Sequence, residues 1–170
     1  MKAPSVEPPR LWRLTLVSRR LLNLAGWFFP LNNNRGTVLA CHGVGANRAD
    51  ILEFIVILQD AGFQVLCFDF RGHGESDGHT VSYGFRERQD VLGAWDHLMT
   101  RPDVDPNRIY GFGLDDVTIP PDCTRILFDG YGGPKKLRLE PGAGHGGTAG
   151  MDTARYRREL RAFFLGQGNE

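Results

Sequence analysis

The sequence predicts a three-layer α/β sandwich with a mainly parallel sheet. From residue 26 onward, short β-branched and apolar runs alternate with amphipathic helical segments, which is the pattern of strand–helix–strand units with right-handed crossovers. Most of the 22 glycines cluster between these segments, as expected for tight turns. With 170 residues, 41% apolar and 24% charged, the composition is that of one folded domain.

The chain divides into an N-terminal segment, residues 1–25, and an α/β domain, residues 26–170. Residues 1–10 contain three prolines and are expected to form a loose arm. Apolar residues recur at helical spacing over 11–24, which predicts an amphipathic helix. The helix could pack on the domain, or residues 10–29 could contact a membrane surface. Arginines interrupt this segment, so it is not expected to span a membrane.

The body of the domain follows in order. An apolar run at 26–31 ends in a turn cluster, and β-branched or apolar content predicts strands at 37–41 and 64–70. Helical spacing predicts helices at 49–61, ended by Gly62, and at 82–99, capped by Ser82. The remaining predicted elements are a strand at 108–112, a short helix at 121–130, a strand at 137–139 and a helix at 152–165.

The predicted sheet has a definite strand order. We expect the strands to lie in the order 64–70, 37–41, 108–112 and 137–139, all parallel, with 26–31 as an antiparallel addition at the edge. Ligands of such sheets bind at the carboxyl ends of the strands. Polar residues follow four of these ends: His42, the segment 71–78, the pair Asp115 and Asp116, and His145.

Four stretches of the chain resemble the α/β-hydrolases, in particular the branch of serine aminopeptidases and acylglycerol lipases. They are TVLACHGVGANRAD, GFQVLCFDFRGHGESDG, DDVTIPP and LRLEPGAGHGG, in this order. The resemblance implies an α/β-hydrolase fold and a hydrolase of esters, amides or lipid-like substrates. Neither a cofactor nor a metal is implied.

The resemblance also implies roles for four residues. The loop at Gly43 and Val44 would supply one backbone N–H of an oxyanion hole. Asp116 would orient the catalytic histidine, and His145 would be that histidine. Two alternatives remain open, because Asp116 could cap a following helix and His145 could be an ordinary loop residue.

The nucleophile of a serine hydrolase is missing. The strand at 108–112 is similar to the lead-in of the G-x-S-x-G elbow, but Asp115 stands where the serine would follow, and the chain runs directly into Asp116. This junction suggests an internal deletion that has removed the elbow. Of the four serines, only Ser76 lies in a G-x-S-x-G pattern, and the resemblance places it in another loop.

Three functions therefore remain open: an inactive or very weak truncated hydrolase, a small-ester hydrolase that uses Ser76 or Asp115, and a non-enzymatic binding or membrane-surface module. The 20 basic residues balance the 20 acidic ones, which argues against nucleic acid as a partner. Three cysteines without metal-ligand spacing argue against a disulfide scaffold or a structural zinc. We expect a cytoplasmic protein, with residues 10–29 as the part that would contact a membrane.

Overall fold

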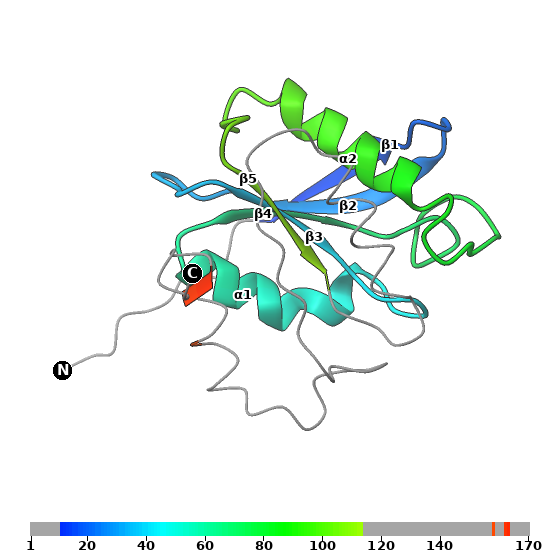
Figure 1. Ribbon diagram of the computed structural model, residues 1–170, viewed down its shortest axis with the longest axis horizontal. Coiled ribbons are helices and arrows are strands. Elements are labelled where there is room, and N and C mark those ends of the chain that lie inside the picture. Colours follow the sequence, from blue (N-terminus) through cyan, green and yellow to red (C-terminus); the bar gives the residue numbers. More distant parts are fainter. Residues whose placement is uncertain (1–10, 114–157, 159–161, 164–170) are drawn as a thin grey trace.

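The computed structural model describes residues 11–113 together with Arg158, Ala162 and Phe163. Within them, five strands form one sheet in the order β1-β2-β4-β3-β5 (Figure 1). The strands are β1 (Trp12–Val17), β2 (Asn23–Phe29), β3 (Thr37–Cys41), β4 (Gln64–Phe68) and β5 (Ile109–Gly113).

The parallel part of the sheet confirms the predicted strand order. β3 lies between β4 and β5 and pairs with both in parallel, so that Val38 is opposite Val65 on one side and Tyr110 on the other. The predicted strand at 137–139 and the predicted helix at 121–130 lie outside the described residues.

The predicted helix at 11–24 is wrong. This segment forms β1, a turn and the start of β2, and the two strands pair antiparallel from Trp12 opposite Phe28 to Val17 opposite Asn23. The spacing of the leucines fitted a helix. Trp12, Leu14 and Leu16 also alternate with the residues between them, and pairing with β2 favours this second period. Residues 11–24 therefore do not form the amphipathic helix from which membrane contact was predicted.

The antiparallel addition was predicted in part. β2 pairs antiparallel with β4, as expected for the run at 26–31. It begins at Asn23, earlier than predicted, and it is not the edge strand, because β1 lies outside it.

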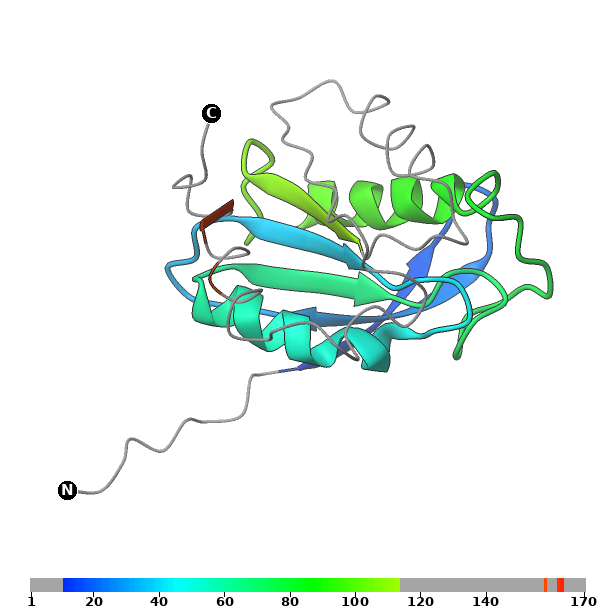
Figure 2. The ribbon, with the colours of Figure 1, turned by 60° about the horizontal axis from the view of Figure 1, so that its bottom comes forward.

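Two helices cover opposite faces of the sheet and complete the predicted three layers (Figure 2). After the 3-10 helix η1 (Arg48–Ile51), α1 (Leu52–Asp60) packs Phe54, Ile55 and Leu58 against one face. On the other face, α2 (Arg88–Thr100) packs Ala94 and Leu98.

Successive side chains of β3 point to opposite faces of the sheet and pack in two different cores. Val38 and Ala40 belong to the core beneath α1, while Leu39 belongs to the core beneath α2. Such burial on both faces is typical of the central strands of a parallel sheet and explains their continuous apolar sequence.

Two further predictions concern helices. The helix expected from Ser82 begins only at Arg88, because residues 83–87 form turns. Within the helix expected at 152–165, the three described residues, Arg158, Ala162 and Phe163, are helical. None of the helices in the described ranges has the length and apolar content that crossing a bilayer requires.

Candidate functional site at the carboxyl end of the sheet

The loop after β3 is held in place by two histidines. His42 is buried, and its Nε2 accepts a hydrogen bond of 3.0 Å from the backbone N–H of Phe70, so its proton is on Nδ1, which donates to the Gly43 carbonyl at 2.7 Å. Burial lowers the pKa of His42, which keeps the ring neutral. The hydrogen bond from Phe70 thereby connects the loop after β3 to the loop after β4.

His73 makes the matching connection from the opposite loop. Its Nε2 accepts a hydrogen bond of 3.1 Å from the Gly45 N–H, and its Nδ1 lies 3.0 Å from the Arg71 carbonyl. The ring centroids of His73 and His42 are 5.2 Å apart. Both histidines thus shape the loop that carries Gly43 and Val44, and neither has a ring nitrogen available as a base.

Asp69 is the centre of the loop that follows β4. Its buried carboxylate accepts hydrogen bonds from the backbone N–H of Arg48 at 2.7 Å and of Glu75 at 2.9 Å, and it forms an ion pair with the Arg48 guanidinium. Arg48 also pairs with Glu75, and its guanidinium carbon lies 4.6 Å from the centroid of the Trp27 ring. This arrangement satisfies a buried charge and fixes the course of residues 69–76.

Gly74 is required by this geometry. Its φ is +50°, and a Cβ at this position would overlap the Asp69 carboxylate. Only glycine accommodates both the left-handed backbone and the close approach.

Ser76 joins the same loop to β2. Its hydroxyl donates a hydrogen bond of 2.6 Å to the Asp69 carbonyl and accepts one of 2.9 Å from the Ala25 N–H. Within the described ranges, the hydroxyl has no histidine partner that could accept its proton. Its observed contacts are those of a structural serine.

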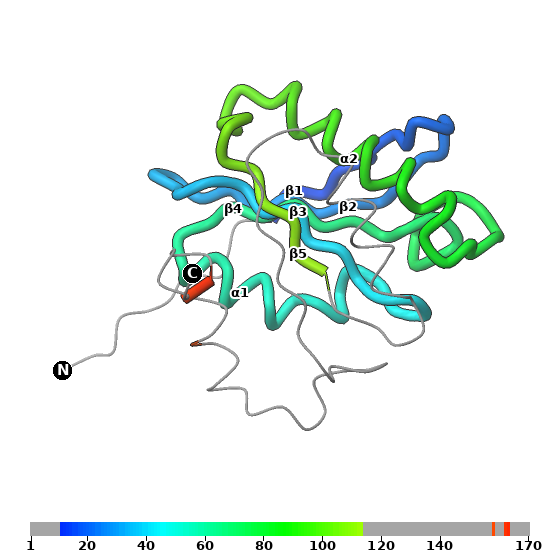
Figure 3. Tube along the Cα trace, in the orientation of Figure 1, coloured from blue at the N-terminus to red at the C-terminus, as the bar shows by residue number. Residues whose placement is uncertain are grey.

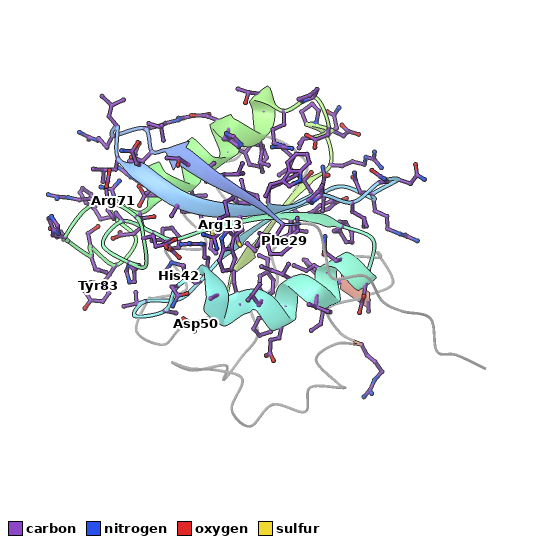
Figure 4. The ribbon with its side chains drawn as sticks, turned by 180° about the vertical axis from the view of Figure 1, so that it is seen from behind. Arg13, Phe29, His42, Asp50, Arg71 and Tyr83 are labelled. Atoms are coloured by element: carbon purple, nitrogen blue, oxygen red, sulfur yellow. The ribbon has the colours of Figure 1, made fainter. Side chains whose placement is uncertain are left out.

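A second buried ion pair connects this loop to α2. The Arg71 guanidinium donates two hydrogen bonds to the Asp90 carboxylate, at 2.9 and 2.6 Å, and both side chains are buried. Hydrogen bonding to Asp90 raises the pKa of Arg71. Figure 4 shows His42, Arg71 and Tyr83 at the same end of the sheet.

The two loops border an open surface pocket of about 460 Å³. Its lining includes Val44, Gly45, Asn47, His73 and Tyr83. The backbone N–H groups of Gly43 and Val44 have no acceptor among the described residues. These are the two residues that the sequence predicted to contribute to an oxyanion hole.

The other predicted site residues cannot be placed. Asp115, Asp116 and His145 lie outside the described residues. In the described ranges, no group of three His, Cys, Asp or Glu side chains could hold a metal ion.

The cysteines of the described strands do not supply a nucleophile. Burial raises the pKa of Cys41 and of Cys67 to about 12, so both are thiols at neutral pH. Cys123 lies outside the described residues.

Sequence reasoning gave no role to Arg48 or Asp90. Their partners, Asp69 and Arg71, stand in the quoted motif, but the pairs are separated by 21 and 19 residues and nothing in the local pattern indicates them.

A parallel sheet with helices on both faces, a histidine–glycine loop after β3 and a glycine-rich loop after β4 define an α/β-hydrolase core. The sequence supports this assignment, since residues 32–111 match the family model of the serine aminopeptidases, S33. The described part of the chain is therefore similar to the α/β-hydrolases in sequence and in fold.

Three known proteins illustrate the similarity. YqkD of Bacillus subtilis is 36% identical over 69 residues, which cover 41% of this chain and 23% of YqkD. The α/β-hydrolase domain-containing protein WAV2 of Arabidopsis thaliana is 33% identical over 95 residues, 54% of this chain and 30% of WAV2. The structure of the Pyrococcus furiosus esterase Pf2001 aligns with a TM-score of 0.57 at 26% identity, covering 62% of this chain and 42% of the esterase.

The chain thus spans about a quarter to two fifths of the length of these proteins. The match to the family model ends at Gly111, four residues before Asp115. This is the point where the sequence loses its similarity to a nucleophile elbow.

Proposed function

We propose that this protein is a truncated α/β-hydrolase with little or no hydrolytic activity. The single observation that carries the proposal is the position of Ser76. This is the only serine of the chain in a G-x-S-x-G pattern, and its hydroxyl donates to the Asp69 carbonyl instead of to a histidine. A serine needs a base to remove its proton before it can attack a carbonyl carbon.

The remaining parts of the machinery support slow chemistry at most. In the proposal, Gly43 and Val44 keep one half of an oxyanion hole, and the other half is lost because it comes from the residue after the nucleophile. Asp116 and His145 would form an acid–base pair that can activate only a water molecule. Enzymes that lose triad members but keep the oxyanion hole retain roughly 10³-fold catalysis over water, and this chain would keep less.

Two catalytic alternatives make different predictions. An active hydrolase through Ser76 would need the hydroxyl to leave both of its present partners, Asp69 and Ala25. An active hydrolase through Asp115 would attack with a carboxylate, as the sequence position allows. Substrates in either case would be small esters, amides or lipid-like molecules.

Hydrolysis of p-nitrophenyl acetate and butyrate by the purified chain tests the proposal. We expect turnover close to the background of free imidazole, unchanged in Ser76→Ala and in Asp115→Asn. Saturable turnover that either substitution abolishes would contradict the proposal and identify the nucleophile. Turnover lost only in His145→Ala would instead indicate water activated by that histidine, in agreement with the residual chemistry described above.

A further inference from the structure

The turn between β1 and β2 presents an apolar side chain at its tip. Leu21 is 85% exposed, the largest exposure among the apolar side chains of the described ranges, and its φ is +58°. A leucine in left-handed backbone is disfavoured by its Cβ, and asparagine or glycine is usual there. Within the described residues, this side chain buries little apolar surface and lies in a disfavoured backbone conformation.

A second exposed apolar side chain lies in the segment that leads into α2, and the first turn of α2 contacts the β1–β2 turn. Phe85 is 69% exposed and precedes α2 by one turn. The Arg19 N–H donates a hydrogen bond of 3.1 Å to the Gln89 carbonyl, which fixes the β1–β2 turn against the start of α2. Figures 1 and 3 show the turn and the segment leading into α2 at the same end of the molecule.

The charge around these two side chains is positive. Arg20, Arg86 and Arg88 are exposed and have no carboxylate partner among the described residues. The Arg88 guanidinium carbon lies 5.2 Å from the centroid of the Phe85 ring. We name the set Arg20, Leu21, Phe85, Arg86 and Arg88 the Leu21–Phe85 surface.

The acidic side chains nearby are already engaged. Asp96 pairs with Arg19, Asp90 pairs with Arg71, and Asp77 accepts hydrogen bonds from Asn23. Glu87 is buried and accepts from Ser82 and Gly84. Among the residues that the structure describes, the three arginines of the surface therefore have no compensating carboxylate.

We propose that the Leu21–Phe85 surface binds an anionic lipid bilayer. Arginines beside a membrane are attracted by anionic headgroups, and apolar side chains at turn tips gain free energy when they leave water for the acyl region. An acidic protein would need an apolar pocket for each of the two side chains, whereas the acyl region of a bilayer accepts both without a specific shape. The surface is a pair of turns on the folded domain, and it does not depend on a helix in residues 11–24.

Sedimentation of the full chain with phosphatidylcholine vesicles, with and without phosphatidylserine, tests this proposal. We expect binding to the phosphatidylserine vesicles that weakens with added salt, and little binding to phosphatidylcholine alone. Leu21→Asn with Phe85→Ser removes the apolar tips and should weaken binding roughly tenfold or more. Arg86→Gln with Arg88→Gln should do the same, at about fivefold for each arginine.

The controls separate loss of binding from loss of folding. Val56→Gln with Met99→Gln replaces exposed apolar side chains elsewhere and should leave vesicle binding unchanged. Leu21→Asn should keep or raise the thermal midpoint, because asparagine tolerates positive φ. The proposal is overturned if the chain does not bind phosphatidylserine vesicles, or if Leu21→Asn with Phe85→Ser binds them as tightly as the unaltered chain.

Discussion

At the scale of single residues, Asp69 organises the carboxyl end of the sheet. One buried carboxylate receives two backbone N–H groups and the Arg48 guanidinium, so two loops from different strands depend on it. Buried charges of this kind are tolerated only when every partner is in place. The neighbouring glycine and serine, Gly74 and Ser76, are explained by the space and the hydrogen bonds around this group.

Gly74→Ala should destabilise the fold strongly. The added Cβ would overlap the Asp69 carboxylate in a backbone conformation that alanine avoids. We expect a loss of about 3 kcal/mol in the free energy of unfolding, measured by urea titration. Gly111→Ala is the matched control, since a Cβ there has no neighbour within 4 Å and should change stability by at most about 0.5 kcal/mol. Equal effects of the two substitutions would refute the close contact.

Ser76→Ala should affect stability and leave any esterase signal unchanged. The substitution leaves the Asp69 carbonyl and the Ala25 N–H without their serine partner. We expect the free energy of unfolding to fall by about 1–3 kcal/mol, measured by urea titration. Ser82→Ala, in which another serine hydroxyl with two polar contacts is removed, provides the comparison. A stable Ser76→Ala protein with a lower rate of ester hydrolysis would contradict the structural role.

Residue by residue, the sequence predicted the loops better than their connections. It placed Gly43 and Val44 at a strand end, because strand–glycine boundaries are local signals. The Arg48–Asp69 pair joins segments 21 residues apart, and its existence depends on β3 and β4 being adjacent. Such long-range pairs cannot be deduced from the composition of either segment.

At the scale of elements, the start of α2 depends on one buried carboxylate. Glu87 accepts hydrogen bonds from the Ser82 hydroxyl and from the backbone N–H groups of Ser82 and Gly84. Burial disfavours its ionised form, but these hydrogen bonds outweigh burial and lower the pKa of Glu87 below its usual 4.5. The turns before the helix are thus stabilised by the charged form.

Glu87→Gln should therefore cost stability in a pH-dependent way. Because the folded pKa is depressed, the contribution of Glu87 is fully present above about pH 4.5 and is lost as the pH falls through the folded value. We expect a loss of about 1–2 kcal/mol at pH 7 that shrinks toward zero in acid, measured by urea titration across pH. Glu53→Gln, on exposed α1 surface, should show no such dependence. A pH-independent difference would mean that the hydrogen bonds do not favour the ionised carboxylate.

Among elements, the central strands were predictable and the N-terminal hairpin was not. The segments 37–41 and 64–68 are buried on both faces, and their short length and β-branched or aromatic content favoured strands over helices. The segment 12–17 is an edge strand with mixed exposure, and its apolar residues fit a helical and a strand period equally well. Pairing with β2 decides between them, and that partner is not visible in the local sequence.

At the scale of the whole molecule, residues 11–113 contain the sheet order, the two helical layers and the strand-end loops of an α/β-hydrolase. The family match ends at Gly111, and the sequence then reaches Asp115 and Asp116 without a serine elbow. In the account proposed here, the chain keeps the scaffold of a hydrolase without its nucleophile. Resequencing of the encoding gene would show whether the missing block is present there.

Covalent labelling tests the central claim most directly. The purified chain is incubated with a fluorophosphonate probe, which modifies activated serines, and its intact mass is measured beside that of an active serine hydrolase and of Ser76→Ala. Our account predicts the unmodified mass for both forms of this chain and a single adduct on the active hydrolase. A stoichiometric adduct on the unaltered chain that is absent from Ser76→Ala would contradict the account and establish Ser76 as a working nucleophile.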